Sequence, residues 1–209
     1  DLGVTIGAAY LANYRFNKNK KRKIFYEKHN YFGPGFSKDQ IKEEILKSKL
    51  KFTELKKNLN SEVAKFLSEG KLVGWFQGNM EFGPRALGSR SIIADARSPK
   101  MQKNLNLKVK FRESFRPFAP SILREDLNEW FDLNCDSPYM LLVDKIKESK
   151  MLKLTESQKK LFGIERLNIK RSEIPAVTHV DYSARIQTVD GESNLKYFKL
   201  IKKFKEITG

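Results

Sequence analysis

A run of glycine, proline and arginine between residues 74 and 97 constrains this chain more than any other part of its sequence. Glycine lets the backbone turn tightly or approach a ligand closely, and proline fixes the direction of a turn. Arginine side chains held on such a frame suit bidentate recognition of phosphate or carboxylate. The residues concerned are Gly78, Gly83, Pro84, Arg85, Gly88, Arg90 and Arg97. A surface turn with solvated arginines is the alternative, and the run alone does not exclude it.

A second basic cluster lies between residues 108 and 121, beside two further prolines. Its members are Lys108, Lys110, Arg112 and Arg116. In a helix, three of them would share a face at a spacing of four residues, and in an extended segment three would share a face at even spacing. Either arrangement gathers positive charge, which predicts a bound anion. The alternative is internal pairing with Glu113, Glu125 or Asp126.

A third segment, residues 175–189, places a histidine, an aspartate, a serine and an arginine within seven positions. His179 and Arg185 are suited to binding phosphate, and Asp181 is suited to orienting a histidine or a metal-bound water. A histidine beside a strand is also often a structural residue whose hydrogen bonds are satisfied internally. The segment by itself leaves both interpretations open.

The composition limits the class of protein. The net charge of +16 indicates an anionic partner, although the charge is mostly lysine and is spread along the chain. A single cysteine, Cys135, excludes an intrachain disulfide, and two histidines argue against a histidine-based metal site. No apolar run reaches the roughly 18–20 residues that span a bilayer, and no signal peptide opens the sequence. We therefore expect a cytoplasmic protein without a membrane partner.

Hydrophobic patterning predicts an α/β fold, bordering on α+β, in which helices pack against a mixed sheet. Ser37 and Gln40 predict a capping box, Gly70 the end of a helix, and Ser98-Pro99 the start of another. The expected helices cover residues 1–12 after a glycine turn, a segment from 37, 61–69, a segment from 98 ending before 117, 126–131, part of 147–172, and 195–204. The expected strands cover residues 72–76, 91–94, 119–123, 139–143 and 184–188.

Together, the three arginine-bearing segments resemble the C-terminal part of the O-carbamoyltransferases of nodulation and antibiotic tailoring. Those enzymes carry M-E-F-G-P-R-A-L-G-x-R-S, then K-x-R-E-x-F-R-P-F-A-P, then P-A-V-T-H-V-D-x-S/T-A-R-x-Q-T-V. The resemblance covers residues 60–209 in order. Residues 1–14 resemble the end of the family's N-terminal domain, which has an actin-like ATPase fold. We therefore expect the tail of that domain at 1–14, a basic linker at 15–36, and a C-terminal domain at 37–209 that is cut short at its end.

The resemblance implies a YrdC-like domain with a twisted mixed sheet and flanking helices. In the family this domain uses carbamoyl phosphate and ATP, with Mg²⁺, to make carbamoyl adenylate, and the N-terminal domain passes the carbamoyl group to an acceptor hydroxyl. Family analogy assigns phosphate binding and catalysis to Arg85, Lys110 and Arg116, and further substrate contacts to Arg90, Arg112, Ser121, His179 and Arg185. Asp1 matches a family Fe²⁺ ligand whose partner histidines lie upstream, so iron is expected only in a full-length enzyme.

Three positions depart from the family pattern. Asn79 stands where arginine is frequent, Ala96 replaces a proline, and Tyr182 replaces a glycine. If the backbone at 182 has a positive φ, Tyr182 would be strained or the loop reshaped. Because of these departures, a catalytically degenerate domain with only a structural role remains an alternative interpretation. A basic RNA-binding module is the other alternative, but the chain lacks an RNP-like aromatic pattern, so nucleic acid is not the expected partner.

Overall fold

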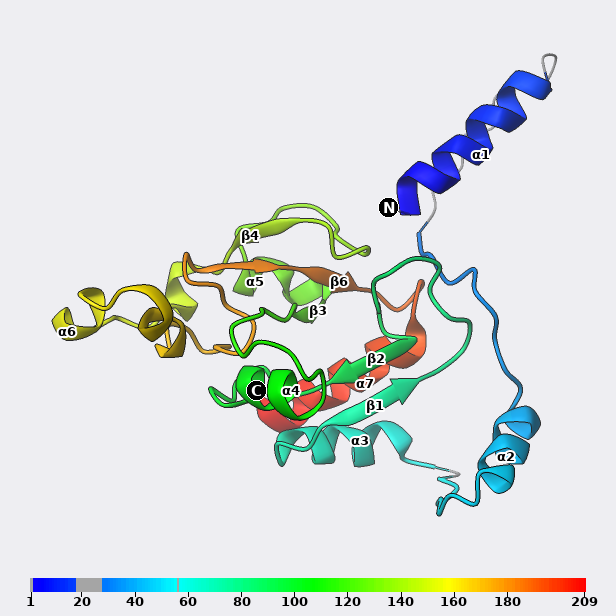
Figure 1. The fold of residues 1–209 in the computed structure, drawn as a ribbon, viewed down its shortest axis with the longest axis horizontal. Helices are drawn as coiled ribbons and strands as arrows, with labels where there is room; N and C mark the ends of the chain where they lie inside the picture. Colours follow the sequence, from blue (N-terminus) through cyan, green and yellow to red (C-terminus); the bar gives the residue numbers. More distant parts are fainter. Residues whose placement is uncertain (1, 18–27, 56) are drawn as a thin grey trace.

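The computed structural model describes residues 2–17, 28–55 and 57–209 and confirms the α/β class (Figure 1). The α-helices in these residues are α1 (Leu2–Phe16), α2 (Lys38–Lys47), α3 (Leu59–Ser68), α4 (Met101–Lys108), α5 (Leu127–Trp130), α6 (Glu156–Lys159) and α7 (Leu195–Thr208). The 3-10 helices are η1 (Arg124–Asp126), η2 (Glu148–Lys150) and η3 (Gly163–Asn168). The strands are β1 (Val73–Phe76), β2 (Arg90–Ile93), β3 (Ser121–Leu123), β4 (Val143–Lys145), β5 (Ser183–Arg185) and β6 (Gln187–Val189).

The strands pair in three short ladders within the described residues. Strands β1 and β2 are antiparallel, β3 and β6 are parallel, and β4 and β5 are antiparallel. Strands β5 and β6 are halves of one extended stretch, residues 183–189, whose first half pairs with β4 and whose second half pairs with β3. This stretch therefore joins two ladders. The sheet is more fragmented than the sequence predicts, since the expected strand at 139–143 begins only at Val143.

Three apolar clusters form among the described residues, and the third, the smallest, contains Met101 and Leu105 of α4 and Ala176. Helix α7 packs with α3 against the β1–β2 ladder through Leu200, which is 1% exposed, and Ala64 of α3, which is 0% exposed (Figure 1). A second cluster lies between α5 and the β4–β5 ladder and includes Phe131, Ile146 and Ile186. The sequence predicts a core-facing stripe of Leu195, Phe198, Ile201 and Phe204. The last three pack against the cluster of α3 and α7, whereas Leu195 is 50% exposed and the buried residues of α7 are Tyr197 and Leu200.

Local capping signals explain some helix ends and not others. The side chains of Ser37 and Gln40 form the predicted capping box at the start of α2, and Gly70, with φ of +79°, follows the end of α3. The prediction of an N-cap at Ser98 is wrong, because α4 starts at Met101.

The prediction of one helix within 147–172 is also wrong. A separate capping box at Thr155 starts the short α6, so the segment folds as short turns instead.

Residues that the sequence assigns to a linker pair with the arginine-rich loop. Phe82 and Asn30 exchange two hydrogen bonds, from the Phe82 N–H to the Asn30 carbonyl and from Asn30 Nδ2 to the Phe82 carbonyl. Gly33 donates its N–H to the Met80 carbonyl at 2.9 Å, and Gly35 forms a bridge with Asn79. This part of the chain therefore supports the candidate site. Residues 18–27 of the predicted linker lie outside the described residues.

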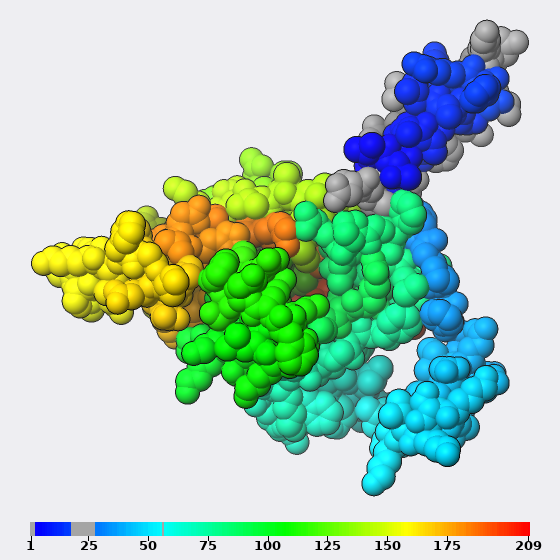
Figure 2. Space-filling model, viewed as in Figure 1, coloured from blue at the N-terminus to red at the C-terminus, as the bar shows by residue number. Residues whose placement is uncertain are grey.

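Helix α1 stands clear of the remaining fold, and the segment that contains α6 projects on the opposite side (Figure 2). Among the described residues, no helix is both long and apolar enough to cross a membrane. The predicted domain boundaries at 14 and 36 stay predictions.

The turn at residues 179–183 places Tyr182 in a backbone conformation that favours glycine. Tyr182 has φ of +66°, in the left-handed region. The His179 N–H donates to the Ser183 carbonyl at 2.7 Å, and the Tyr182 N–H donates to the His179 carbonyl at 3.1 Å. A three-residue hairpin loop of this kind places its last residue in the left-handed region, where glycine is favoured. Tyr182 adopts this conformation and packs its side chain against the cluster of Phe131 and Ile186.

We expect Tyr182→Gly to be more stable than Tyr182→Ala by about 1 kcal/mol. Both variants lose the same tyrosine packing, but only alanine keeps a Cβ in the left-handed conformation. Urea unfolding of the two variants measures the difference. The control is the same pair of substitutions at Lys199, an exposed position on α7, where alanine should be the more stable residue. An alanine variant as stable as glycine at 182 would mean that the turn is not strained.

Candidate functional site

A buried carboxylate organises the loop between β1 and β2. The Glu81 side chain is 0% exposed, and its Oε1 accepts hydrogen bonds from the backbone N–H of Leu87 at 2.6 Å and of Ser89 at 2.8 Å. Its Oε2 accepts from Arg90 Nε at 3.1 Å, and the Arg90 guanidinium also donates to the Gly83 carbonyl. These bonds satisfy donors that would otherwise be unpaired away from water. Glu81 therefore fixes the shape of the loop, and Arg90 is engaged in holding it.

Gly88 allows this loop to approach α7 closely. Its φ is +101°, and a Cβ at this position would lie 2.4 Å from Cδ1 of Tyr197. Tyr197 is almost fully buried, and burial raises the pKa of its phenol. The glycine therefore meets two needs at once, a left-handed backbone and contact with an aromatic ring.

A cavity of about 740 Å³ lies beside the loop. In the space-filling view the surface is hollowed between the green segment around α4 and the teal segment that carries the β1–β2 loop (Figure 2). Five of the eight residues assigned by family analogy line the cavity: Arg85, Lys110, Arg112, Ser121 and Arg185. Three segments far apart in the sequence thus meet at one site.

The charges around this cavity are unequally paired. All four acidic residues of the lining form ion pairs with basic residues that also line it. These pairs are Asp95–Arg97 at 2.7 Å, Asp126–Lys205 at 2.6 Å, Glu129–Lys150 at 3.0 Å and Glu173–Lys150 at 3.8 Å. The other basic lining residues form no ion pair with any described residue, and they are Arg85, Lys110, Arg112 and Arg185. The cavity therefore presents uncompensated positive charge to a ligand.

The charged form of Arg185 is disfavoured by its burial and by the nearby charge of Arg85. Burial lowers the pKa of Arg185, and the nearby charge of Arg85 lowers it further. Nε of Arg185 is buried and has no hydrogen-bond partner among the residues that the structure describes. A buried donor without a partner is uncommon in folded proteins and calls for an explanation. An anion between the two guanidinium groups would relieve both the repulsion and the missing bond.

Arg112 is held in place by neutral groups. Its Nε donates to Oδ1 of Asn106 at 2.7 Å, and its guanidinium lies 5.0 Å from the centre of the Phe118 ring. Asn106 is 0% exposed and donates from Nδ2 to the carbonyls of Ser114 and Arg116. The positive charge of Arg112 is thus oriented without being neutralised. Sequence reasoning missed Asn106, whose only signal is a polar residue on an otherwise core-facing part of α4.

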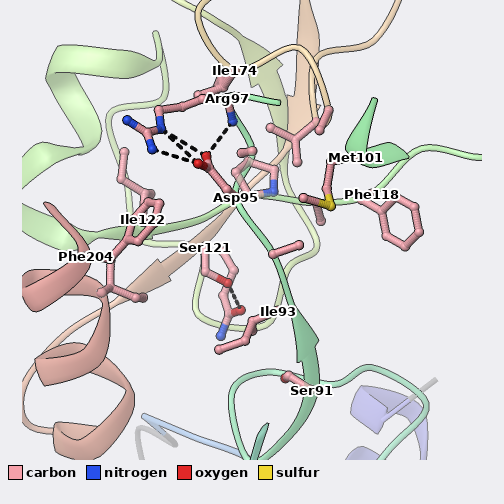
Figure 3. Close-up of a pocket in the computed structure, with 18 of the residues that line it drawn as sticks. Ser91, Ile93, Asp95, Arg97, Met101, Phe118, Ser121, Ile122, Ile174 and Phe204 are labelled. Carbon is pink, nitrogen blue, oxygen red and sulfur yellow. Dashed lines mark hydrogen bonds and ion pairs between the residues drawn. The ribbon is translucent and has the colours of Figure 1, made fainter. Parts of the chain in front are cut away.

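Ser121 connects the β3–β6 ladder to the arginine-rich loop. Its Oγ donates to Oε1 of Gln187 at 2.8 Å (Figure 3), and Nε2 of Gln187 donates to the Leu87 carbonyl at 2.9 Å. The relay fixes the loop against the ladder, and both side chains line the cavity.

Arg97, the third arginine of the first segment, has a structural role at the other end of the cavity. It binds both oxygens of the buried Asp95 through its Nε, and its Nη2 donates to Oδ2 at 2.7 Å (Figure 3). Its Nη1 donates to the Thr208 carbonyl at 3.3 Å, and its guanidinium lies over the Phe204 ring. The pair therefore fastens the C-terminal turn of α7 to the segment after β2.

Three of the assigned residues lie outside this cavity: Arg90, Arg116 and His179. Nε of Arg116 donates to Oε2 of Glu113 at 2.9 Å, and both side chains are about half exposed. This is the internal pairing that the sequence left open as an alternative. His179 lines a second, smaller cavity. Roles for these three in substrate binding stay predictions.

The described residues contain no group of three or more histidine, cysteine, aspartate or glutamate side chains placed to hold a metal ion. Asp1, which matches the family's iron ligand, lies outside the described residues. The side chains described here therefore do not fit a resident metal by themselves, and Fe²⁺ in a full-length enzyme stays a prediction.

The chain matches the family model described as "Carbamoyltransferase C-terminus" over residues 64–209. It is 48% identical over 214 residues to an uncharacterized protein of Synechocystis, covering 100% of this chain and 35% of that protein. It is 36% identical over 214 residues to the nodulation protein NolNO of Sinorhizobium fredii, covering 100% of this chain and 28% of the relative.

A named carbamoyltransferase is also among the relatives. The 3'-hydroxymethylcephem-O-carbamoyltransferase of Streptomyces clavuligerus is 38% identical over 143 residues, which are 68% of this chain and 23% of that enzyme. The chain spans about a third of the length of the first relatives that it matches, between 28% and 35%.

Proposed function

This chain belongs to the carbamoyltransferase family through the C-terminal domain that the family model describes, and on that premise we propose that it binds ATP and carbamoyl phosphate and forms carbamoyl adenylate. Carbamoyl phosphate, ATP and one water would give carbamoyl adenylate, phosphate and pyrophosphate. The carbamoyl group then passes to an acceptor hydroxyl, with AMP leaving, in a domain outside this chain. The YrdC-like fold expected from the resemblance is part of this proposal.

The observation that carries the proposal is the set of basic side chains without acidic partners around one cavity. Arg85, Lys110, Arg112 and Arg185 form no ion pair, whereas each acidic residue of the lining does. A triphosphate brings several negative charges to a small volume. A cavity of about 740 Å³ with surplus positive charge suits such a ligand better than it suits a neutral one.

In this proposal the arginines hold phosphate oxygens and neutralise charge that develops on them as pyrophosphate leaves. Arg85 and Arg185 act as a pair because they lie close enough to repel each other before the anion arrives. Arg112 is pre-oriented by Asn106, which lowers the cost of ordering it on binding. Lys110 is exposed and has the freedom to follow the ligand. Mg²⁺ would enter with the nucleotide phosphates and offset part of their charge.

Calorimetric titration of ATP with Mg²⁺ into this chain tests the proposal, and we expect saturable binding. Binding in a cavity should depend only weakly on salt, because buried pairs are screened less than surface ones. Adding carbamoyl phosphate should then release one pyrophosphate and one phosphate per ATP consumed. Arg85→Ala should weaken binding by roughly 10- to 100-fold, the value of one or two charged hydrogen bonds.

Two results would contradict the proposal. A folded chain that binds no ATP would show that the cavity is not a nucleotide site by itself. Binding of RNA that weakens steeply with salt, without saturable ATP binding, would favour the nucleic-acid alternative. Lys199→Gln, which removes one exposed charge on α7 outside both cavities, is the control for general effects of net charge.

A further inference from the structure

A second cavity of about 470 Å³ adjoins the first and has no role in the proposed nucleotide site. The two cavities share the lining residues Gln102, Pro117, Ala176 and Val177. The remaining lining residues are Phe115, Arg166 and Leu167 of η3, Arg171, and residues 178–181, which include His179 and the carboxylate of Asp181. The second cavity therefore brings together η3 and residues 178–181, neither of which lines the first cavity.

Two arginines supply the positive charge of this second cavity. Arg171 is 4% exposed, and its Nη2 donates to the backbone carbonyl of Arg166. The second arginine of the lining is Arg166. The guanidinium groups of Arg166 and Arg171 form no ion pair with any residue in the described part of the chain. Burial lowers the pKa of Arg171; the nearby Tyr182 raises it, and the charge of Arg166 lowers it. A buried arginine beside another arginine is stabilised by an anion.

A histidine in the same lining has its hydrogen bonds fixed by its neighbours. Ser183 Oγ donates its proton to Asp181 Oδ1 at 2.7 Å, and it lies 3.0 Å from Nδ1 of His179. Since the serine proton is committed to the aspartate, Nδ1 must carry a proton and donate it to the serine oxygen. In the neutral ring Nε2 is then an acceptor. Burial lowers the pKa of His179 below its ordinary value, which favours this neutral form near pH 7.

We propose that the second cavity binds a small phosphate-type anion that carries its own N–H or O–H donor. Arg166 and Arg171 would receive the charged oxygens, and Nε2 of His179 would accept the ligand's proton donor. Hydrogen phosphate and carbamoyl phosphate both meet this description, whereas sulfate at neutral pH carries no donor. The site differs from the nucleotide cavity, and its existence does not rest on ATP binding there.

The histidine ring provides a local reporter for this proposal. The chain contains only two histidines, His29 and His179, so ¹⁵N-labelled ring spectra are assigned with a His29→Gln variant. We expect His179 in the Nδ1-protonated neutral form in the free protein. Phosphate should shift its Nε2 signal at concentrations at least about tenfold below those that sulfate requires, the worth of one hydrogen bond. His29 should not respond.

Variants separate this site from the first cavity. Arg166→Gln should weaken the phosphate response by about tenfold, and its exposed position avoids the folding risk of replacing Arg171. Arg85→Ala should leave the response of His179 unchanged, because Arg85 lines only the first cavity. A tighter response to carbamoyl phosphate than to phosphate would identify the donor substrate as the ligand, and the reverse order would identify released phosphate.

Three outcomes would overturn the proposal. The first is a His179 signal that phosphate leaves unchanged, and the second is a response to sulfate equal to that for phosphate. The third is a response that Arg85→Ala abolishes, because it would place the bound anion in the first cavity.

Discussion

Replacing Arg185 with glutamine is expected to weaken ATP binding by roughly 10- to 100-fold without making the protein less stable. The free protein holds this guanidinium close to Arg85, with its Nε buried and lacking a partner among the described residues. Removing the charge takes away both costs, so the free energy of unfolding should stay the same or rise. The bound state loses a charged contact to phosphate. Function and stability therefore move in opposite directions.

Calorimetric titration of ATP and urea unfolding, carried out on the same samples, measure the two effects. Lys199→Gln is the matched control, since it also removes one positive charge but lines neither cavity. It should change neither quantity. Unchanged ATP affinity in the Arg185 variant would show that this arginine does not contact the nucleotide. A large loss of stability would show that its role is structural.

Replacing Glu81 with alanine is expected to destabilise the protein by about 3–5 kcal/mol, because each buried donor left without its acceptor costs about 1–3 kcal/mol. The substitution leaves the N–H groups of Leu87 and Ser89 without their acceptor and Arg90 without its carboxylate. The loop that presents Arg85 to the cavity would then lose its shape. We therefore expect weaker ATP binding even under conditions in which the variant is folded.

Urea unfolding with comparison of midpoints measures this effect, and Glu113 provides the control. Glu113 also pairs with an arginine, Arg116, but both side chains are about half exposed. Exposed pairs contribute little to stability, so Glu113→Ala should leave the midpoint nearly unchanged. Equal effects of the two substitutions would mean that the loop does not depend on Glu81.

The sequence alone predicts features that depend on nearby residues. The capping box of Ser37 and Gln40, the helix end at Gly70 and the packing of Phe198, Ile201 and Phe204 on α7 all arise from spacing within one to three helical turns. The errors at Ser98 and in residues 147–172 arose where a local signal competed with tertiary packing, which decides where short helices begin.

What the sequence by itself determined is the set of charged residues available for binding and the α/β class. The three arginine-bearing segments are recognisable as patterns, because each needs a particular residue type at a particular position in a turn. Residue types and turn positions are properties of neighbouring residues along the chain.

Only the tertiary structure decided which of those charges remain free. Arg90, Arg97 and Arg116 resemble Arg85 and Arg185 in sequence, yet each of the first three is ion-paired and the last two are not. Pairing depends on which carboxylate the fold brings within about 3–4 Å, and that distance is set by ladders joining residues far apart, such as β3 with β6. The second cavity likewise depends on tertiary structure, because its lining residues Gln102, Arg171 and His179 come from separate parts of the chain.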